Sequence, residues 1–110
     1  MTEREPVLDR TRLDRITRGN PSLARELIGE LVDESRGVVE RVRAAIGASA
    51  AREVHDAAHK LKGMAGELGA LRLRAAALAL EVETSPERWP AALATVERAL
   101  NELQPPSPID

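Results

Sequence analysis

One long apolar repeat limits what this chain can fold into. Between Pro21 and Gly47, apolar side chains recur at helical spacing, namely Leu23, Leu27, Leu31, Val38, Val42 and Ile46. This spacing predicts an amphipathic helix of about seven turns. Asn20 suits the N-cap of this helix and Pro21 suits its first position. Such a helix must bury its apolar face against partners, and no segment has the period of a β-strand.

The remaining apolar residues predict four more helices. A short one from Val7 to Thr17, closed by Gly19, should lie across the end of a bundle. Two others run from about Ala50 to Leu68 and from Leu71 to Glu83, and the last helix begins between Glu87 and Pro90. Connections this short make successive helices antiparallel neighbours. The expected fold class is therefore all-α, an antiparallel four-helix bundle with a short N-terminal helix.

Local signals add detail to this bundle. Ser49 could cap the helix from Ala50 to Leu68, and Gly69 could end it. The next helix should turn five apolar residues inward: Leu73, Ala76, Ala77, Leu80 and Val82. The only aromatic residue, Trp89, is expected to cover the bundle end.

The length of 110 residues fits one domain. We expect a frayed N-terminus over residues 1–6, a helical domain over residues 7–104 and a proline-rich tail over residues 105–110. Met1 followed by a whole domain favours a free-standing protein over a piece of a hybrid kinase. The apolar stripes can all be buried internally, so a monomer is the default expectation.

Composition excludes several classes of function. With 16 Lys and Arg against 18 Asp and Glu, no basic field favours nucleic acid. The absence of cysteine excludes disulfides and thiolate metal sites. No signal peptide and no apolar stretch of about 20 residues is present, so we expect no membrane span and a cytoplasmic location. No glycine-rich nucleotide loop or Walker motif is present, which argues against an ATP-dependent kinase.

One histidine stands out on the helix from Ala50 to Leu68. The apolar residues of this helix share one arc, and His59 lies roughly opposite the centre of that arc. Gly63 and Gly66 follow at i+4 and i+7 on the same exposed stripe, although each helical glycine costs about 1 kcal/mol relative to alanine. Lys62, at i+3, could reach an anion held on His59. This pattern indicates a ring that a large partner approaches closely.

The segment His59-Lys60-Leu61-Lys62-Gly63, continued by Gly69-Ala70 and then by Leu73, Leu80 and Glu81, resembles the histidine phosphotransfer (HPt) domain family. The resemblance runs from about Val7 to Leu103. Many family members have a phenylalanine near the position of Val32 and a cysteine near that of Ala77, and both differences here affect packing only.

The resemblance implies a phosphocarrier of two-component phosphorelays, with no ATP-binding or autokinase role. His59 would accept the phosphoryl group and exchange it with aspartates of response-regulator receiver domains. Lys62 would stabilise the phosphoryl charge, and Gly63 and Gly66 would give steric access. A hybrid histidine kinase is the other expected partner. This chain would bind no cofactor, and Mg²⁺ would sit on the receiver domain.

Other interpretations stay open for the residues around His59. His55, at i−4, has the spacing of a two-histidine metal site, but a third ligand is not evident, and a rim residue is the preferred interpretation. Arg52, Lys60 and Arg72 are solvated residues or partner-docking residues. The alternatives for the whole chain are a regulator that docks receivers without transferring phosphate, and a structural helical adaptor whose glycine face packs against another helix.

Overall fold

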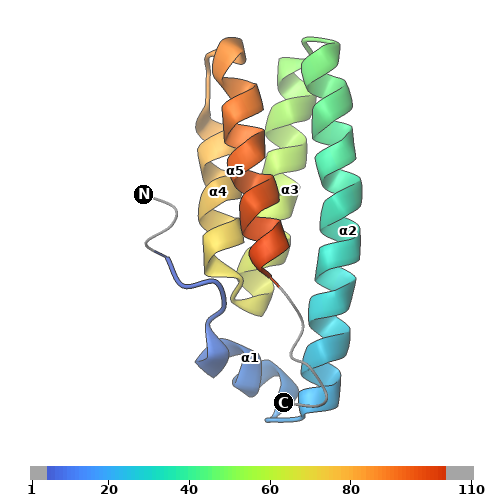
Figure 1. Cartoon of the computed structure of the whole chain (residues 1–110), viewed down its shortest axis with the longest axis vertical. Helices are drawn as coiled ribbons and strands as arrows, with labels where there is room; N and C mark the ends of the chain where they lie inside the picture. Colours follow the sequence, from blue (N-terminus) through green and yellow to red (C-terminus); the bar gives the residue numbers. More distant parts are fainter. Residues whose placement is uncertain (1–4, 104–110) are drawn as a thin grey trace.

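The computed structural model describes residues 5–103, and the expected tail lies outside them, as does most of the expected frayed N-terminus. The helices are α1 (Arg10–Thr17), α2 (Pro21–Gly47), α3 (Ala51–Leu68), α4 (Leu71–Val82) and α5 (Trp89–Glu102), with a short 3₁₀ turn, η2 (Pro86–Arg88), before α5. Helix α2 packs on α3, α3 on α4, α4 on α5 and α5 on α2 (Figure 1). The predicted all-α antiparallel four-helix bundle is confirmed.

The start of α2 follows from its capping residues. The Asn20 side chain accepts hydrogen bonds from the backbone N–H groups of Ser22 and Leu23, at 3.0 and 3.1 Å. Pro21 occupies the first helical position, where no N–H is needed. Of the expected apolar residues, Leu31, Val38 and Val42 turn inward and are at most 5% exposed, whereas Leu23, Leu27 and Ile46 are half-buried.

Small residues bring α3 and α4 close together. Ala57, Ala58 and Ala65 of α3 and Ala76 and Ala77 of α4 are all at most 2% exposed. Alanine allows two helix backbones to approach without displacing larger side chains. The connection is Gly69 and Ala70 alone, and Gly69 ends α3 in the left-handed conformation at φ +79°, as predicted.

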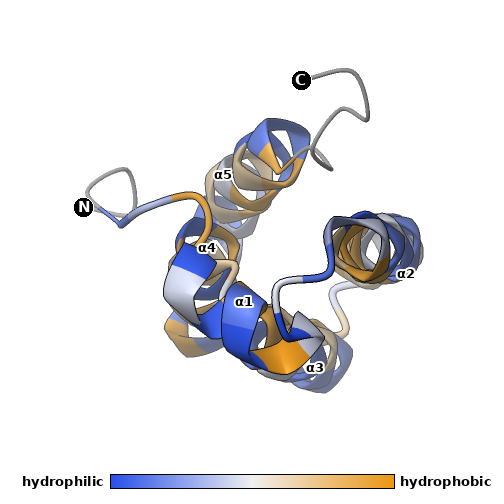
Figure 2. Cartoon of the chain, turned by 90° about the horizontal axis from the view of Figure 1, so that it is seen from below, coloured by the Kyte–Doolittle hydropathy of each residue, from blue (hydrophilic) through white to orange (hydrophobic). Residues whose placement is uncertain are grey.

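Helix α1 lies across the end of the bundle where α3 ends (Figures 1 and 2). The Asp9 N–H donates to the Gly69 carbonyl at 2.7 Å, and Arg12 Nε donates to the Glu67 carbonyl at 3.0 Å. Leu13 and Thr17 are the buried residues of α1, each 3% exposed, and Leu13 joins the apolar core. The short N-terminal helix is thus tied to the turn between α3 and α4.

Three local expectations need correction. Ser49 does not cap α3: it takes φ +55° and belongs to the turn that ends α2, where its N–H donates to the Ile46 carbonyl. Val82 is 63% exposed because it follows the inward residue Leu73 by two and a half turns, which places it on the opposite side of α4. The first helix begins at Arg10, three residues later than expected, since Asp9 caps it.

The other end of the bundle contains Trp89. This side chain is 4% exposed, and its Nε1 donates to the Glu83 carbonyl at 3.4 Å, so it covers the link between α4 and α5 as expected. None of the described helices is both long enough and apolar enough to cross a bilayer.

Candidate functional site

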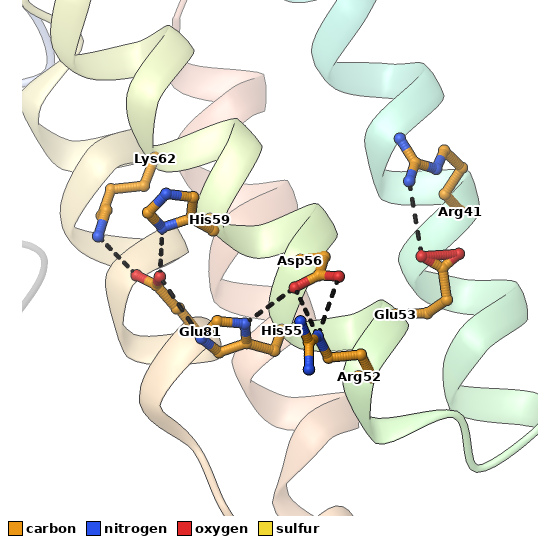
Figure 3. A network of polar contacts seen from close by, with 8 residues as sticks. All are labelled: Arg41, Arg52, Glu53, His55, Asp56, His59, Lys62 and Glu81. Atoms are coloured by element: carbon orange, nitrogen blue, oxygen red, sulfur yellow. Dashed lines mark hydrogen bonds and ion pairs between the residues drawn. The ribbon is translucent and has the colours of Figure 1, made fainter.

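His59 lies on the solvent face of α3. Its side chain is 64% exposed, while its neighbours Ala58 and Leu61 are fully buried at 0%. The burial pattern confirms the predicted orientation, in which the apolar arc of α3 faces the core and the imidazole is exposed. Figure 3 shows the ring on α3 beside Glu81 of α4.

A carboxylate from α4 holds one nitrogen of this ring. His59 Nδ1 lies 2.5 Å from Oε2 of Glu81, whose side chain is only 9% exposed. An ionised carboxylate only accepts hydrogen bonds, so in the neutral ring the proton belongs on Nδ1. We assign this tautomer from the hydrogen-bond partner. It leaves the lone pair on Nε2, the nitrogen that Glu81 does not contact.

Lys62 completes the contacts of Glu81. Its Nζ lies 2.7 Å from Oε1 of the carboxylate, and the lysine side chain is 24% exposed. The hydrogen bond from Lys62, followed by that from His59, holds the pKa of Glu81 below its ordinary value, against the opposing effect of burial. Glu81 therefore stays ionised at neutral pH between one lysine and one imidazole. Contact of Lys62 with a phosphoryl group stays a prediction, because in this structure its ammonium is held by Glu81.

The two glycines beside His59 differ in their surroundings. A Cβ placed on Gly63 meets no neighbouring atom within 4 Å, so the space one turn after the histidine is open. A Cβ on Gly66 would lie 3.1 Å from Cδ of Arg74, a residue of α4 whose side chain lies against α3 at this position. The space at Gly63 is therefore open, whereas that at Gly66 is occupied by an arginine of the neighbouring helix, and the steric role of both glycines stays a prediction.

His55 lies one turn before His59, as its spacing predicted. The two rings are nearly parallel, at 7°, with centroids 6.3 Å apart. His55 Nδ1 is 3.2 Å from Asp56 Oδ1, and its Nε2 is 3.7 Å from Oε2 of Glu81. The contact with His55 lowers the pKa of Asp56, with a smaller contribution from Arg52. Within residues 5–103, no group of three or more His, Cys, Asp or Glu side chains could hold a metal ion.

The expected docking residues do not gather in one place. Arg52 lies beside Asp56 near the start of α3, and Lys60 is exposed next to His59. Arg72 lies at the other end of α4, where its guanidinium donates to the Glu5 carbonyl and pairs with Glu102 at 3.0 Å. Its side chain is 20% exposed and links the N-terminal segment and α5 to α4, and its docking role stays a prediction.

The sequence interpretation gave Glu81 no role, although counting along the helices could have found it. Leu68 and Leu71 flank the connection between the antiparallel helices α3 and α4. Since both helices rise equally per residue, nine positions back from Leu68 and ten forward from Leu71 reach His59 and Glu81 at nearly the same level. An acidic residue at the level of His59 on the next helix could therefore have been predicted as a partner of its ring.

The comparison with protein families decides the classification. The model of the Hpt domain family matches residues 26–105. The chain belongs to the Hpt domain family. Hpt domains are phosphocarriers that work with receiver domains and kinases in two-component signalling, which gives this Hpt chain a role in histidine phosphotransfer.

A solved structure agrees with this assignment. The crystal structure of histidine-containing phosphotransfer protein B (HptB) from Pseudomonas aeruginosa PAO1 superposes with a TM-score of 0.79 at 25% identity. The match covers 90% of this Hpt chain and 89% of HptB. A search of curated proteins finds no match.

Proposed function

We propose that this Hpt domain relays a phosphoryl group between aspartates of receiver domains through His59. The observation that carries the proposal is the state of the His59 ring: Nδ1 is bonded to the Glu81 carboxylate, and the ring is 64% exposed. A neutral imidazole with its lone pair facing solvent is a good nitrogen nucleophile at pH 7.

The transfer balances without any further reagent. Nε2 of His59 donates its lone pair to the phosphorus of a receiver's aspartyl phosphate. The P–O bond to the aspartate breaks, and its electron pair leaves with the carboxylate oxygen. The proton on Nδ1 stays in place, so the phosphorylated ring carries a positive charge that Glu81 neutralises. Transfer to a second receiver reverses these steps.

The surroundings support an in-line approach by a large partner. Phosphoryl transfer passes through a loose transition state in which the attacking and leaving atoms lie in line, so the receiver's aspartate must reach the open edge of the ring. The space beside Gly63 leaves room for that approach. The receiver would supply Mg²⁺, which neutralises the oxygens of the moving group. Lys62 could add its charge if the phosphoryl group draws it from Glu81.

The test is transfer from a panel of phosphorylated receiver domains to this protein. The product is scored by intact mass and by its acid lability, since a phosphohistidine is lost in acid. We expect an acid-labile adduct with the parent and none with His59→Gln, which keeps the size and polarity of the residue but lacks the nucleophile. Arg15→Gln, an exposed change in α1, is the matched control and should keep the parent's rate.

Three results would contradict the proposal. Binding of a receiver without any adduct would leave a docking regulator, and neither binding nor adduct would favour a structural adaptor. An adduct that persists in His59→Gln would place the acceptor on another residue.

A further inference from the structure

Two imidazoles share one carboxylate oxygen in this site (Figure 3). Oε2 of Glu81 lies 2.5 Å from Nδ1 of His59 and 3.7 Å from Nε2 of His55. The first distance is a hydrogen bond, and the second is the separation of an ion pair when His55 is protonated. Glu81 is nearly buried, so it has little water with which to exchange these partners.

The contact of His55 with Asp56 determines which of its ring nitrogens carries the proton. Its Nδ1 lies 3.2 Å from the Asp56 carboxylate, which only accepts, so Nδ1 carries the proton in the neutral ring. Nε2 of neutral His55 then presents a lone pair to Glu81. Protonation of His55 converts that lone pair into an N–H that attracts Oε2. The charge of His55 therefore affects the strength of the hydrogen bond between Oε2 of Glu81 and Nδ1 of His59.

We propose that His55 is a positioning residue that shares Glu81 with His59 and keeps the His59 ring unprotonated at Nε2 under mildly acidic conditions. The inference rests on the proposed function, since it concerns the availability of the same nucleophile. A cationic His55 competes for Oε2 and adds a positive charge 6.3 Å from the His59 ring centre, and both effects oppose protonation of His59.

The other charged groups around His55 are few. On α3 it faces Asp56 and His59, and Arg52 lies beyond Asp56 at 3.3 Å from that carboxylate. From α4 it faces Glu81, whose second oxygen is bound by Lys62. Imidazoles change charge near neutral pH, whereas carboxylates, lysine and arginine keep theirs, so the two histidines are the groups whose charge varies here.

Two variants bracket the effect of His55 charge. His55→Gln is always neutral, and His55→Lys is always positive in this range. Because His55 is 53% exposed, neither change disturbs the core. The midpoint of the His59 titration, followed by NMR of the ring ¹⁵N nuclei, should lie higher in His55→Gln than in His55→Lys by about half a pH unit. The tautomer at neutral pH is read from the same spectra.

Lys60→Gln is the control for charge alone. Lys60 is adjacent to His59 in sequence. Within residues 5–103, the ion pairs of Glu81 are with His55, His59 and Lys62 and do not include Lys60. Losing this charge should move the His59 midpoint by less than about 0.2 unit, because an exposed charge is well screened. Equal midpoints in His55→Gln and His55→Lys would overturn the proposal, as would a shift in Lys60→Gln as large as theirs.

Transfer rates connect the ring to its function. Relative to the parent, His55→Gln should accept phosphate more slowly at pH 6, by up to about threefold, and equally fast at pH 8, since half a pH unit changes the unprotonated fraction by at most a factor of about three. His55→Lys should restore the rate at pH 6. A uniform loss at both pH values would indicate a merely structural role and contradict the proposal. If the midpoints separate but the parent accepts no phosphate, the proposed function fails while the sharing of Glu81 stands.

Discussion

At the scale of single residues, the candidate site combines one exposed histidine and one nearly buried carboxylate on different helices. The exposure of His59 follows from the helical period of α3, and the sequence pattern alone predicted it. The contact with Glu81 did not follow from that pattern, because a period assigns residues to a face without saying what lies opposite. The cross-helix partner requires the register of α3 against α4, which the short turn at Gly69 fixes.

Gly63→Leu should separate stability from access. Replacing a helical glycine by leucine stabilises a helix by up to about 1 kcal/mol, and no neighbouring atom obstructs a Cβ at this position. The longer side chain would nevertheless lie beside the His59 ring, one turn away. We expect a higher midpoint in urea unfolding together with at least a tenfold loss of phosphoryl acceptance.

Gly37→Leu is the matched control for this change. Gly37 is an exposed glycine inside α2 with the same open space around a Cβ, so its stability gain should be similar and its transfer rate unchanged. Parental transfer in Gly63→Leu would show that the open space beside His59 is not needed.

The Glu81 contacts should make stability depend on pH. Partners of Glu81 lower its pKa from an ordinary value of 4.5, so its contribution to folding is complete above that pH and is lost as the pH falls toward the lower folded value. The difference in unfolding free energy between the parent and Glu81→Gln should therefore be larger at pH 5.5 than at pH 3.5.

Urea unfolding at the two pH values measures this difference. Glu87→Gln, which removes an exposed carboxylate in η2, should show a smaller change between them. An equal difference at both pH values for Glu81→Gln would mean that the contacts with His59 and Lys62 do not stabilise the fold.

At the scale of helices, sequence signals located most boundaries because prolines and caps fix them locally. Asn20 and Pro21 start α2, and Gly69 ends α3, as expected. Ser49 was misassigned because two structures compete for it. A serine before a helix is a good N-cap, but here the N–H of Ala50 donates to Ala45 and closes the end of α2, which forces Ser49 into positive φ.

Gly69→Ala should weaken the turn that sets the α3–α4 register. Gly69 has φ +79°, and an added Cβ would lie 3.1 Å from Cβ of Asp9 and 3.2 Å from Cβ of Arg12. Backbone strain and these contacts should together cost more than about 1 kcal/mol in urea unfolding. Gly47→Ala, at the end of α2 with open space around it, should change stability by less than about 0.5 kcal/mol. Similar effects of the two changes would contradict a special role for the turn.

At the scale of the whole molecule, all four long helices contribute to one core, so the bundle should unfold as one unit. Trp89 reports from the end of the bundle opposite α1, and far-UV circular dichroism reports on all helices at once. We expect their urea transitions to coincide, with equal midpoints and slopes. An earlier fluorescence transition would mean that the η2–α5 end opens before the rest.

The close packing of alanines between α3 and α4 has a chemical consequence. The carboxylate that selects the tautomer of His59 belongs to the other helix, so the spacing of the two backbones sets the length of that hydrogen bond. A larger residue at Ala58 or Ala77, both fully buried, should disturb this spacing and weaken the hydrogen bond between His59 and Glu81. Ordinary core mutations can thus alter the reactivity of a surface histidine, and screens for inactive variants should recover them inside the bundle as well as beside His59.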